Sequence, residues 1–258
     1  MTGTPNILTI LQARTSSSRL PGKVLLPLLG KPMLARQLER VRRARHIGRL
    51  VVATSTDGAD DAVERLCREE GVECHRGSLD DVLDRFYQAA LPRKPEVVVR
   101  LTGDCPLADP AVIDAVIDFF LAGGYDYASN AVEPTFPDGL DVEVFRFECL
   151  EAAWREARLP SQREHVTLFI HGQPERFRVG SLRRVESLGH LRWTVDEPAD
   201  FNFVERVYGA LYPLNPGFAT ADVLALLASH PELAGINTGI TRNEGLQRSL
   251  ERDPQAGS

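Results

Sequence analysis

The first half of the chain alternates short β-branched runs with longer segments of helical periodicity, and this alternation limits the fold more than any other feature. The runs occupy residues 6–12, 49–54, 73–75 and 96–101. Strands separated by helices are typical of a mainly parallel sheet with helices on both faces. The sequence therefore predicts an α/β fold with a mostly parallel, mixed sheet sandwiched by helices.

The segments between these runs have apolar residues at helical spacing. One helix is predicted after a cap at Asp109 and Pro110, and it is expected to end at Gly123 and Gly124. Two earlier helices each have an apolar face, made of Leu34, Leu38 and Val41 in the first and of Val63, Leu66 and Cys67 in the second.

The pattern changes in the second half of the chain. The stretch YDYASNAVEPTFPDGLDVEVF has two extended pieces around a Pro- and Gly-containing turn, which predicts a hairpin or a pair of strands of mixed direction. A capping-box pattern at Ser161 and Glu164 predicts a helix from near Gln162. LRWTV at 191–195 predicts another strand, and Pro198 opens a further helix.

The loop after the first run, QARTSSSRLPGK, places cations among small residues. Its Arg14, Arg19 and Lys23 stand out in a chain whose 36 acidic residues outnumber its 30 basic ones. Ligands of open parallel sheets bind at the carboxyl ends of strands, so this loop is placed to hold a polyphosphate, with Pro21 and Gly22 turning the chain toward Lys23. A solvated basic loop is the alternative. A Walker A loop is excluded, because the Gly-Lys pair is not followed by Ser or Thr.

Two aspartates could hold the divalent cation that polyphosphate chemistry needs. Asp104 in RLTGDCPL follows the run 96–101, and Asp196 in RWTVDEPADF follows the run 191–195. Both would lie at one edge of the sheet, and carboxylate oxygens suit Mg²⁺. Each also precedes a proline-initiated helix, so helix capping is the alternative for either one alone. Asp200 could add a further contact or could lie in solvent.

These segments resemble the cytidylyltransferases that activate acidic sugars, the CMP-Kdo and CMP-sialic acid synthetases. QARTSSSRLPGK is similar to their A-R-x-x-S-x-R-L-P-G-K motif. GSLDDVLDRFYQAA, VVRLTGDCPLADP, FPDGLDVEVF, SQREHVTLFI and RWTVDEPADF are similar to the branch named for the spore coat polysaccharide biosynthesis protein SpsF. The six ordered motifs span about residues 7–240. Gln12 and Cys105 depart from the sugar-acid synthetases, so the resemblance leaves the acceptor open.

The resemblance implies a nucleotidyltransferase domain of the glycosyltransferase-A type that uses CTP as co-substrate and Mg²⁺. The catalytic positions of the family map onto Arg14, Arg19, Lys23, Asp104 and Asp196, of which Asp104 and Asp196 are the metal ligands. The nucleotide would also contact the backbone of Leu11, Gln12 and Ala13 and side chains from the segment Ser78 to Asp81.

The acceptor is expected to lie against residues 130–143 and the helix that follows. The candidate side chains for binding it are Asn130, Asp138, Asp141, Glu143, Arg163 and His165. Alternation in DGLDVEV puts Asp141 and Glu143 on one face of a strand, which could be a solvated face instead. Arg163 and His165 could pair an acceptor carboxylate or phosphate, although a capping turn explains that segment without a ligand.

The expected reaction is attack by an acceptor oxygen on the α-phosphorus of CTP, with release of pyrophosphate, for surface polysaccharide synthesis. The alternatives are a sugar-1-phosphate nucleotidylyltransferase or a glycosyltransferase that uses another nucleotide, and a non-catalytic nucleotide-binding module. Residues 1–240 are expected to form one domain with a sugar-binding and dimerisation ribbon near 125–146. Residues 241–258 would add a C-terminal helix and a polar tail.

The remaining features bear on compartment and partners. The four cysteines lack a CxxC pair and no export segment is recognisable, which favours a reduced, cytoplasmic protein. The apolar runs are too short for a transmembrane helix, and the acidic excess argues against nucleic acid as a partner. A homodimer is suggested by the family resemblance.

Overall fold

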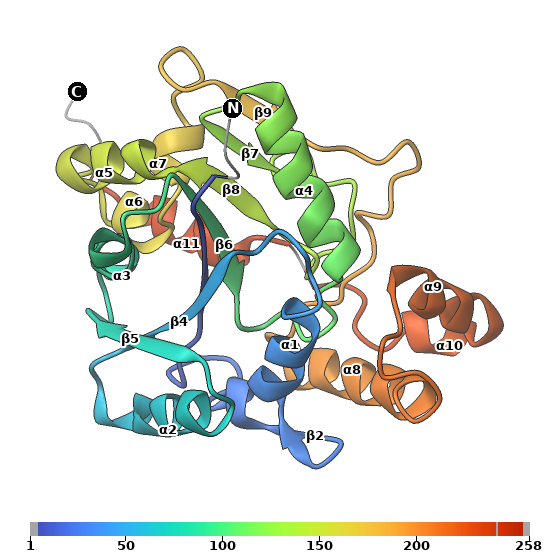
Figure 1. Cartoon of the computed structure of the whole chain (residues 1–258). Coiled ribbons are helices and arrows are strands. Elements are labelled where there is room, and N and C mark those ends of the chain that lie inside the picture. The colour runs from blue at the N-terminus through green and yellow to red at the C-terminus, as the bar shows by residue number, and fades with distance from the viewer. Residues whose placement is uncertain (1–4, 241, 255–258) are drawn as a thin grey trace.

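A seven-stranded mixed sheet lies at the centre of the computed structural model, which describes residues 5–240 and 242–254 (Figure 1). The strands of this sheet are β1 (Ile7–Gln12), β4 (Arg49–Ser55), β5 (Glu73–Gly77), β6 (Val97–Thr102), β7 (Tyr127–Ser129), β8 (Glu143–Arg146) and β9 (Val179–Ser181). Two short strands, β2 (Pro27–Leu28) and β3 (Lys31–Pro32), pair outside it.

The sheet has the order β5-β4-β1-β6-β8-β7-β9. Its first four strands are parallel, β8 is antiparallel to both β6 and β7, and β9 is parallel to β7. The expected parallel half and the expected pair of mixed direction are therefore both confirmed. Gln12 at the end of β1 is level with Ala53 of β4 and Thr102 of β6, so three carboxyl ends meet at one edge.

Helices connect and cover the strands. They are α1 (Met33–Val41), α2 (Asp61–Glu69), α3 (Val82–Ala90), α4 (Pro110–Gly123), α5 (Phe147–Glu156), α6 (Pro160–Glu164), α7 (Leu168–His171), α8 (Pro198–Leu211), α9 (Thr220–Ser229), α10 (Pro231–Ala234) and α11 (Glu244–Glu251). Short 3₁₀ turns lie at η1 (Lys23–Leu25), η2 (Gly58–Asp60) and η3 (Leu91–Arg93).

The apolar faces of these helices pack against both sides of the sheet. Side chains of α1, α2 and α4 form one buried cluster with the sheet, and side chains of α3, α5 and α7 form a second. A third cluster joins α8 and α9 around Trp193. In Figure 1, α3 and α4 accordingly lie on opposite sides of the sheet. Each fully buried leucine or valine stabilises this arrangement by roughly 1.5 to 3 kcal/mol.

The predicted ends of α4 are confirmed, whereas two other predictions are wrong. Asp109 accepts a hydrogen bond from the Ala111 N–H at 2.8 Å, and Gly124 ends the helix with φ of 62°. The segment 191–195 is not a ladder strand: Arg192 makes one bridge, to Asp138, and the Val195 N–H then donates to the Asp104 carbonyl at 2.8 Å. The helix expected near Gln162 starts at Pro160 without a Ser161–Glu164 capping box.

The reason for the second difference is that both capping residues have distant partners. Ser161 donates its backbone N–H to Asp253 at 2.9 Å, and Glu164 accepts a hydrogen bond from Ser249 at 2.7 Å. Gln162 instead accepts the N–H of Leu159. Over the parts of the chain that the structure describes, no helix combines the length and apolar character needed to cross a bilayer.

Candidate active site

The loop after β1 folds back so that Lys23 points into the molecule. Gly22 has φ of 70°, a left-handed conformation that favours glycine, and it begins η1. Asp60 fixes the start of the loop, because one of its carboxylate oxygens accepts both the backbone N–H and the hydroxyl of Thr15, at 2.8 and 2.7 Å. The other oxygen accepts from Ser55 at the end of β4. The predicted turn at Gly22 is therefore confirmed.

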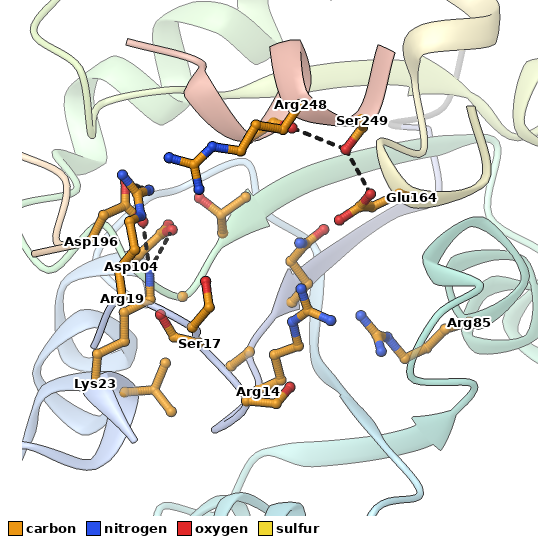
Figure 2. Close-up of a pocket in the computed structure, with 18 of the residues that line it drawn as sticks. Arg14, Ser17, Arg19, Lys23, Arg85, Asp104, Glu164, Asp196, Arg248 and Ser249 are labelled. Carbon is orange, nitrogen blue, oxygen red and sulfur yellow. Dashed lines mark hydrogen bonds and ion pairs between the residues drawn. The ribbon is translucent and has the colours of Figure 1, made fainter. Parts of the chain in front are cut away.

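The ammonium group of Lys23 lies between the two aspartates singled out by the sequence (Figure 2). Its Nζ donates to Asp104 Oδ2 at 3.1 Å, to Asp196 Oδ1 at 2.9 Å and to the Val195 carbonyl at 2.8 Å. Arg19 also bonds Asp196, at 3.0 Å. Two of the three loop cations, Arg19 and Lys23, and both acids thus meet at the carboxyl edge of the sheet.

This cluster sets the protonation of its members. Burial alone raises the pKa of Asp104, but the Lys23 charge and hydrogen bonds from Thr102 and Lys23 outweigh it and lower the pKa to about 2. Burial lowers the pKa of Lys23, and the two carboxylates raise it above its usual value. The Asp104 carboxylate is therefore ionised at neutral pH and is a poor proton acceptor.

Close contact between two loops brings Asp104 to this position. The Gly103 N–H donates to the Gln12 carbonyl at 2.7 Å, and a Cβ at Gly103 would lie 2.8 Å from the Cβ of Ala13. Contacts below 3.0 Å essentially never occur for real Cβ atoms. A side chain at position 103 would push apart the loops that follow β1 and β6.

Two cavities of similar size adjoin this cluster, of about 470 and 490 Å³. The first, called here the basic cavity, is lined by three carboxylates and by the cations Arg14, Arg19, Lys23, Arg85, Arg248 and Arg252. The second, called the acidic cavity, is lined by three arginines and by the carboxylates of Asp104, Asp138, Asp141, Glu143, Asp196 and Glu244. Arg19, Asp104 and Asp196 line both, so a group held at this cluster is accessible from either side.

Arg85 in the basic cavity was not found by sequence reasoning. It belongs to α3, it is 1% exposed, and Figure 2 shows it beside Arg14. Its Nη1 donates to the Ser78 carbonyl at 2.8 Å, while its Nε has no hydrogen-bond partner among the described residues. A buried guanidinium without a carboxylate partner is unfavourable by itself and calls for an anionic ligand. The sequence places Arg85 within a helix but does not reveal that its side chain is buried without a carboxylate partner.

The residues expected near the base and ribose are separated by the structure. Gln12 and Ala13 line the basic cavity, whereas the side chain of Leu11 is fully buried in the core. Ser78 and Asp81 line neither cavity. Their side chains instead cap the start of α3: Ser78 accepts the N–H of Asp81 at 3.0 Å, and Asp81 accepts the N–H of Asp84 at 2.9 Å.

Asp138, Asp141 and Glu143 all line the acidic cavity, but they are not a solvated strand face. Asp138 is bonded by Arg192 at 3.1 Å, and Asp141 by Arg242 at 2.6 Å. Glu143 is 8% exposed. Its partners are the Arg100 guanidinium and the hydroxyls of Tyr127 and Thr167. Burial raises the pKa of Asp141 to about 7 despite the nearby Arg242.

Two other acceptor candidates have structural partners instead. Asn130 is fully buried, and its amide bonds the Leu140 carbonyl and the Val142 N–H, each at 2.8 Å, so it holds the loop before β8. Arg163 lines neither cavity, because its guanidinium pairs with Asp81 at 3.0 Å.

His165 and Asp200 complete the set of predicted residues. His165 lines the acidic cavity and hydrogen bonds Ser249 at 3.0 Å, and burial lowers its pKa. Asp200 is fully buried rather than solvated. It accepts the backbone N–H groups of Asp196 and Glu197, each at 2.9 Å, and pairs with Arg192, so it positions the segment that carries Asp196.

The donor set suits a hard divalent cation that is shared with a ligand. Asp104 and Asp196 converge on one cation, the Lys23 ammonium, which shows that both carboxylates point to the same spot. Within residues 5–240 and 242–254, no group of three or more His, Cys, Asp or Glu side chains forms a metal site. Mg²⁺ is commonly bound by one or two carboxylates together with substrate phosphates, so this pair fits it.

A cationic loop turned by a glycine and two converging aspartates thus lie at the carboxyl edge of the parallel strands, an arrangement that suits a nucleotidyltransferase. Comparison with known proteins specifies this class further. A family model described as cytidylyltransferase matches residues 8–206, and the chain belongs to that family. The predicted resemblance is therefore confirmed.

Three relatives illustrate the similarity. The spore coat polysaccharide biosynthesis protein SpsF of Bacillus subtilis is 36% identical over 89% of this chain and 97% of its own length. The structure of a cytidylyltransferase from Leptospira borgpetersenii superposes with a TM-score of 0.86 at 30% identity, over 92% of this chain and all of that one. A CMP:2-keto-3-deoxy-manno-octonic acid synthetase complexed with CTP shares the fold, with a TM-score of 0.62 at 18% identity, over 79% of this chain and 98% of that one.

Proposed function

We propose that this cytidylyltransferase transfers CMP from CTP to a hydroxyl of a sugar or sugar-like acceptor, releases pyrophosphate and depends on Mg²⁺. The observation that carries the proposal is the position of Asp104, Asp196 and Lys23 at the junction of a basic and an acidic cavity. A triphosphate suits the basic cavity. A polyhydroxyl acceptor suits the acidic one, because carboxylates accept hydrogen bonds from hydroxyl groups.

The residues of the basic cavity would bind and orient the nucleotide. Arg14 and Arg85 can bind phosphate oxygens in bidentate fashion, and Lys23 acts as a compact charge. Mg²⁺ bound to Asp104 and Asp196 would neutralise charge on the α-phosphate and the attacking oxygen. Arg19 lies beside these acids, where it can stabilise the negative charge that develops on the leaving pyrophosphate.

The bond changes are those of a displacement at phosphorus. The acceptor oxygen forms a bond to the α-phosphorus, the bridging bond to the β-phosphate breaks, and its electron pair leaves with pyrophosphate. The acceptor proton passes to solvent, because Asp104 with its pKa near 2 is a weak base. Such transfers rely mainly on positioning and charge neutralisation, so no strong general base is required.

Four further points belong to this proposal. The similarity to SpsF supports a role in surface polysaccharide biosynthesis. The free cysteines of the described chain agree with a reduced, cytoplasmic location. Homodimerisation would use the segment near 125–146, where β7 and β8 lie inside the sheet and Val132 in their connection is exposed. Another nucleotide and a non-catalytic module are the competing functions.

Pyrophosphate release tests the proposal. The protein is incubated with CTP, UTP, GTP or ATP, with Mg²⁺, and with a panel of neutral, carboxylated and phosphorylated sugars. Release that requires CTP, Mg²⁺ and one acceptor class supports cytidylyl transfer. Release with another nucleotide supports the alternative enzyme. CTP binding without release on any acceptor, under conditions where a known cytidylyltransferase turns over, supports the non-catalytic module.

A further inference from the structure

The segment 242–253, called here the C-terminal strap, crosses both cavities. It lies outside the residues matched by the family model. Asn243, Glu244 and Leu246 line the acidic cavity, Gly245 lines both, and the remaining residues facing the basic cavity are Arg248, Ser249 and Arg252. The strap thus forms a wall that the two cavities share.

Both ends of the strap are fastened to the domain. At its start, Arg242 pairs with Asp141 at 2.6 Å. Toward its end, the buried Ser249 donates to Glu164 at 2.7 Å, and Asp253 accepts the backbone N–H of Ser161 at 2.9 Å. These contacts hold α11 in one orientation over the basic cavity, as Figure 2 shows for Arg248 and Ser249.

Between these anchors, one carboxylate lies between two guanidinium groups. Glu244 Oε2 is 3.3 Å from Arg19 Nη1 and 3.0 Å from Arg248 Nη2. Glu244 and Arg248 lie one turn apart on α11, whereas Arg19 belongs to the loop after β1 and lines both cavities, so the Glu244 carboxylate joins the strap to that loop where the two cavities meet. An anionic oxygen in this position is the chemistry that a phosphate group would supply.

We infer that the C-terminal strap is part of the nucleotide-binding site: Arg248 and Arg252 bind the phosphates of the nucleotide, and the Glu244 carboxylate holds Arg19 and Arg248 in the place that a phosphate oxygen takes when it binds. The inference rests on the proposed function. A triphosphate carries more charge than one carboxylate and would displace it from the two guanidinium groups, since the Glu244 side chain is 30% exposed.

Two variants with opposite expected effects test the inference. Arg248→Ala removes a phosphate contact without disturbing the core, because that side chain is 56% exposed. Its affinity for CTP in calorimetric titration should fall about fivefold, the size expected for one partly exposed charge-assisted bond. Glu244→Gln removes the competing charge, and its affinity for CTP should rise about two- to fivefold.

Matched controls come from exposed residues that line neither cavity. Arg206→Ala on α8 removes the same charge as Arg248→Ala, and Glu251→Gln on α11 makes the same change as Glu244→Gln on the same helix. Both controls should bind CTP like the wild type. An Arg248→Ala/Arg252→Ala double variant with unchanged affinity would overturn the role of the strap, and weaker binding by Glu244→Gln would overturn the displacement.

Titration with pyrophosphate separates this inference from the proposed function. If the wild type binds pyrophosphate but not CTP, the cytidylyl assignment fails, while the same variants, titrated with pyrophosphate, still decide whether the strap binds the phosphates. If it binds CTP and the variants do not differ, the strap inference alone fails. If the wild type binds neither probe, both fail.

Discussion

Arg14 and Arg85 line the same cavity although both carry a positive charge, and the Arg14 charge makes the protonated form of Arg85 less favourable. Burial and the nearby Arg14 guanidinium lower the pKa of Arg85 to about 10. A protein gains nothing in stability from such a pair, because like charges repel and a buried charge loses its hydration. The pair is explained by a ligand whose negative charge compensates for it.

The first prediction is that Arg85→Met makes the protein more stable and its nucleotide binding weaker. Methionine keeps the length of the side chain and removes the uncompensated charge. The free energy of unfolding, from urea denaturation, should rise by about 1 kcal/mol or more. The affinity for CTP should fall at least tenfold. Arg85→Lys serves as a control that retains a charge, and a destabilised Arg85→Met with normal CTP affinity would show that Arg85 is a structural residue.

The second prediction concerns the metal. In Lys23→Met the two aspartates face each other without the ammonium group, so the variant should bind Mn²⁺ more tightly than the wild type when no nucleotide is present. Turnover should nevertheless fall by about 10²- to 10³-fold, as expected for the loss of one preorganised charge. Lys31→Met, which replaces an exposed lysine on β3, should change neither property. Equal Mn²⁺ affinity in wild type and Lys23→Met would contradict a shared position for lysine and metal.

The third prediction concerns the residue that fixes the loop after β1. Burial raises the pKa of Asp60, but hydrogen bonds from Ser55 and Thr15 outweigh this and lower the pKa below the usual 3.8. A depressed pKa means that the ionised form adds stability above pH 3.8, which is lost as the pH falls through the lower folded value. Asp60→Ala should reduce the free energy of unfolding at pH 7 by about 2 to 4 kcal/mol. An equal deficit at pH 7 and at pH 2 would argue against this ionised network.

The fourth prediction concerns Asp141 in the acidic cavity. Its pKa near 7 is raised by burial, with Asp138 adding to the effect and Arg242 opposing it. A raised pKa means that the folded state favours the protonated acid, so this group makes the protein less stable as the pH rises from about 4 to 7. Asp141→Asn, which stays neutral, should therefore gain thermal stability relative to the wild type between pH 5 and pH 8. A constant difference in melting temperature over that range would contradict the shift.

Local features were predictable where they depend on near neighbours in the chain. The parallel strands were predictable from the β-branched runs, because strands covered by helices on both faces are apolar along their whole length. The ends of α4 were predictable from Asp109, Pro110 and Gly124, because a capping residue acts within one turn of the helix end. Asp104 could be placed beside the basic loop because carboxyl ends of parallel strands share one edge.

Features that depend on distant partners could not be predicted. Ser161 and Glu164 match a capping box, yet Asp253 and Ser249 take their hydrogen bonds. In the same way, the alternation around Glu143 left open whether this side chain binds the acceptor or faces solvent, because nothing in the local pattern reveals that Arg100 lies opposite it in β6. Such pairs form only when remote elements pack, so no local pattern identifies them.

We expect the nucleotide and its metal to bind between Asp104, Asp196 and the cationic loop. The most direct measurement is a calorimetric titration of the wild type with CTP, UTP, GTP and ATP, with and without Mg²⁺, repeated with CTP on Asp104→Asn and Asp196→Asn. CTP should bind most tightly, Mg²⁺ should strengthen this binding, and both variants should lose the Mg²⁺-dependent part. Mg²⁺-dependent CTP binding that is unchanged in both variants would contradict it.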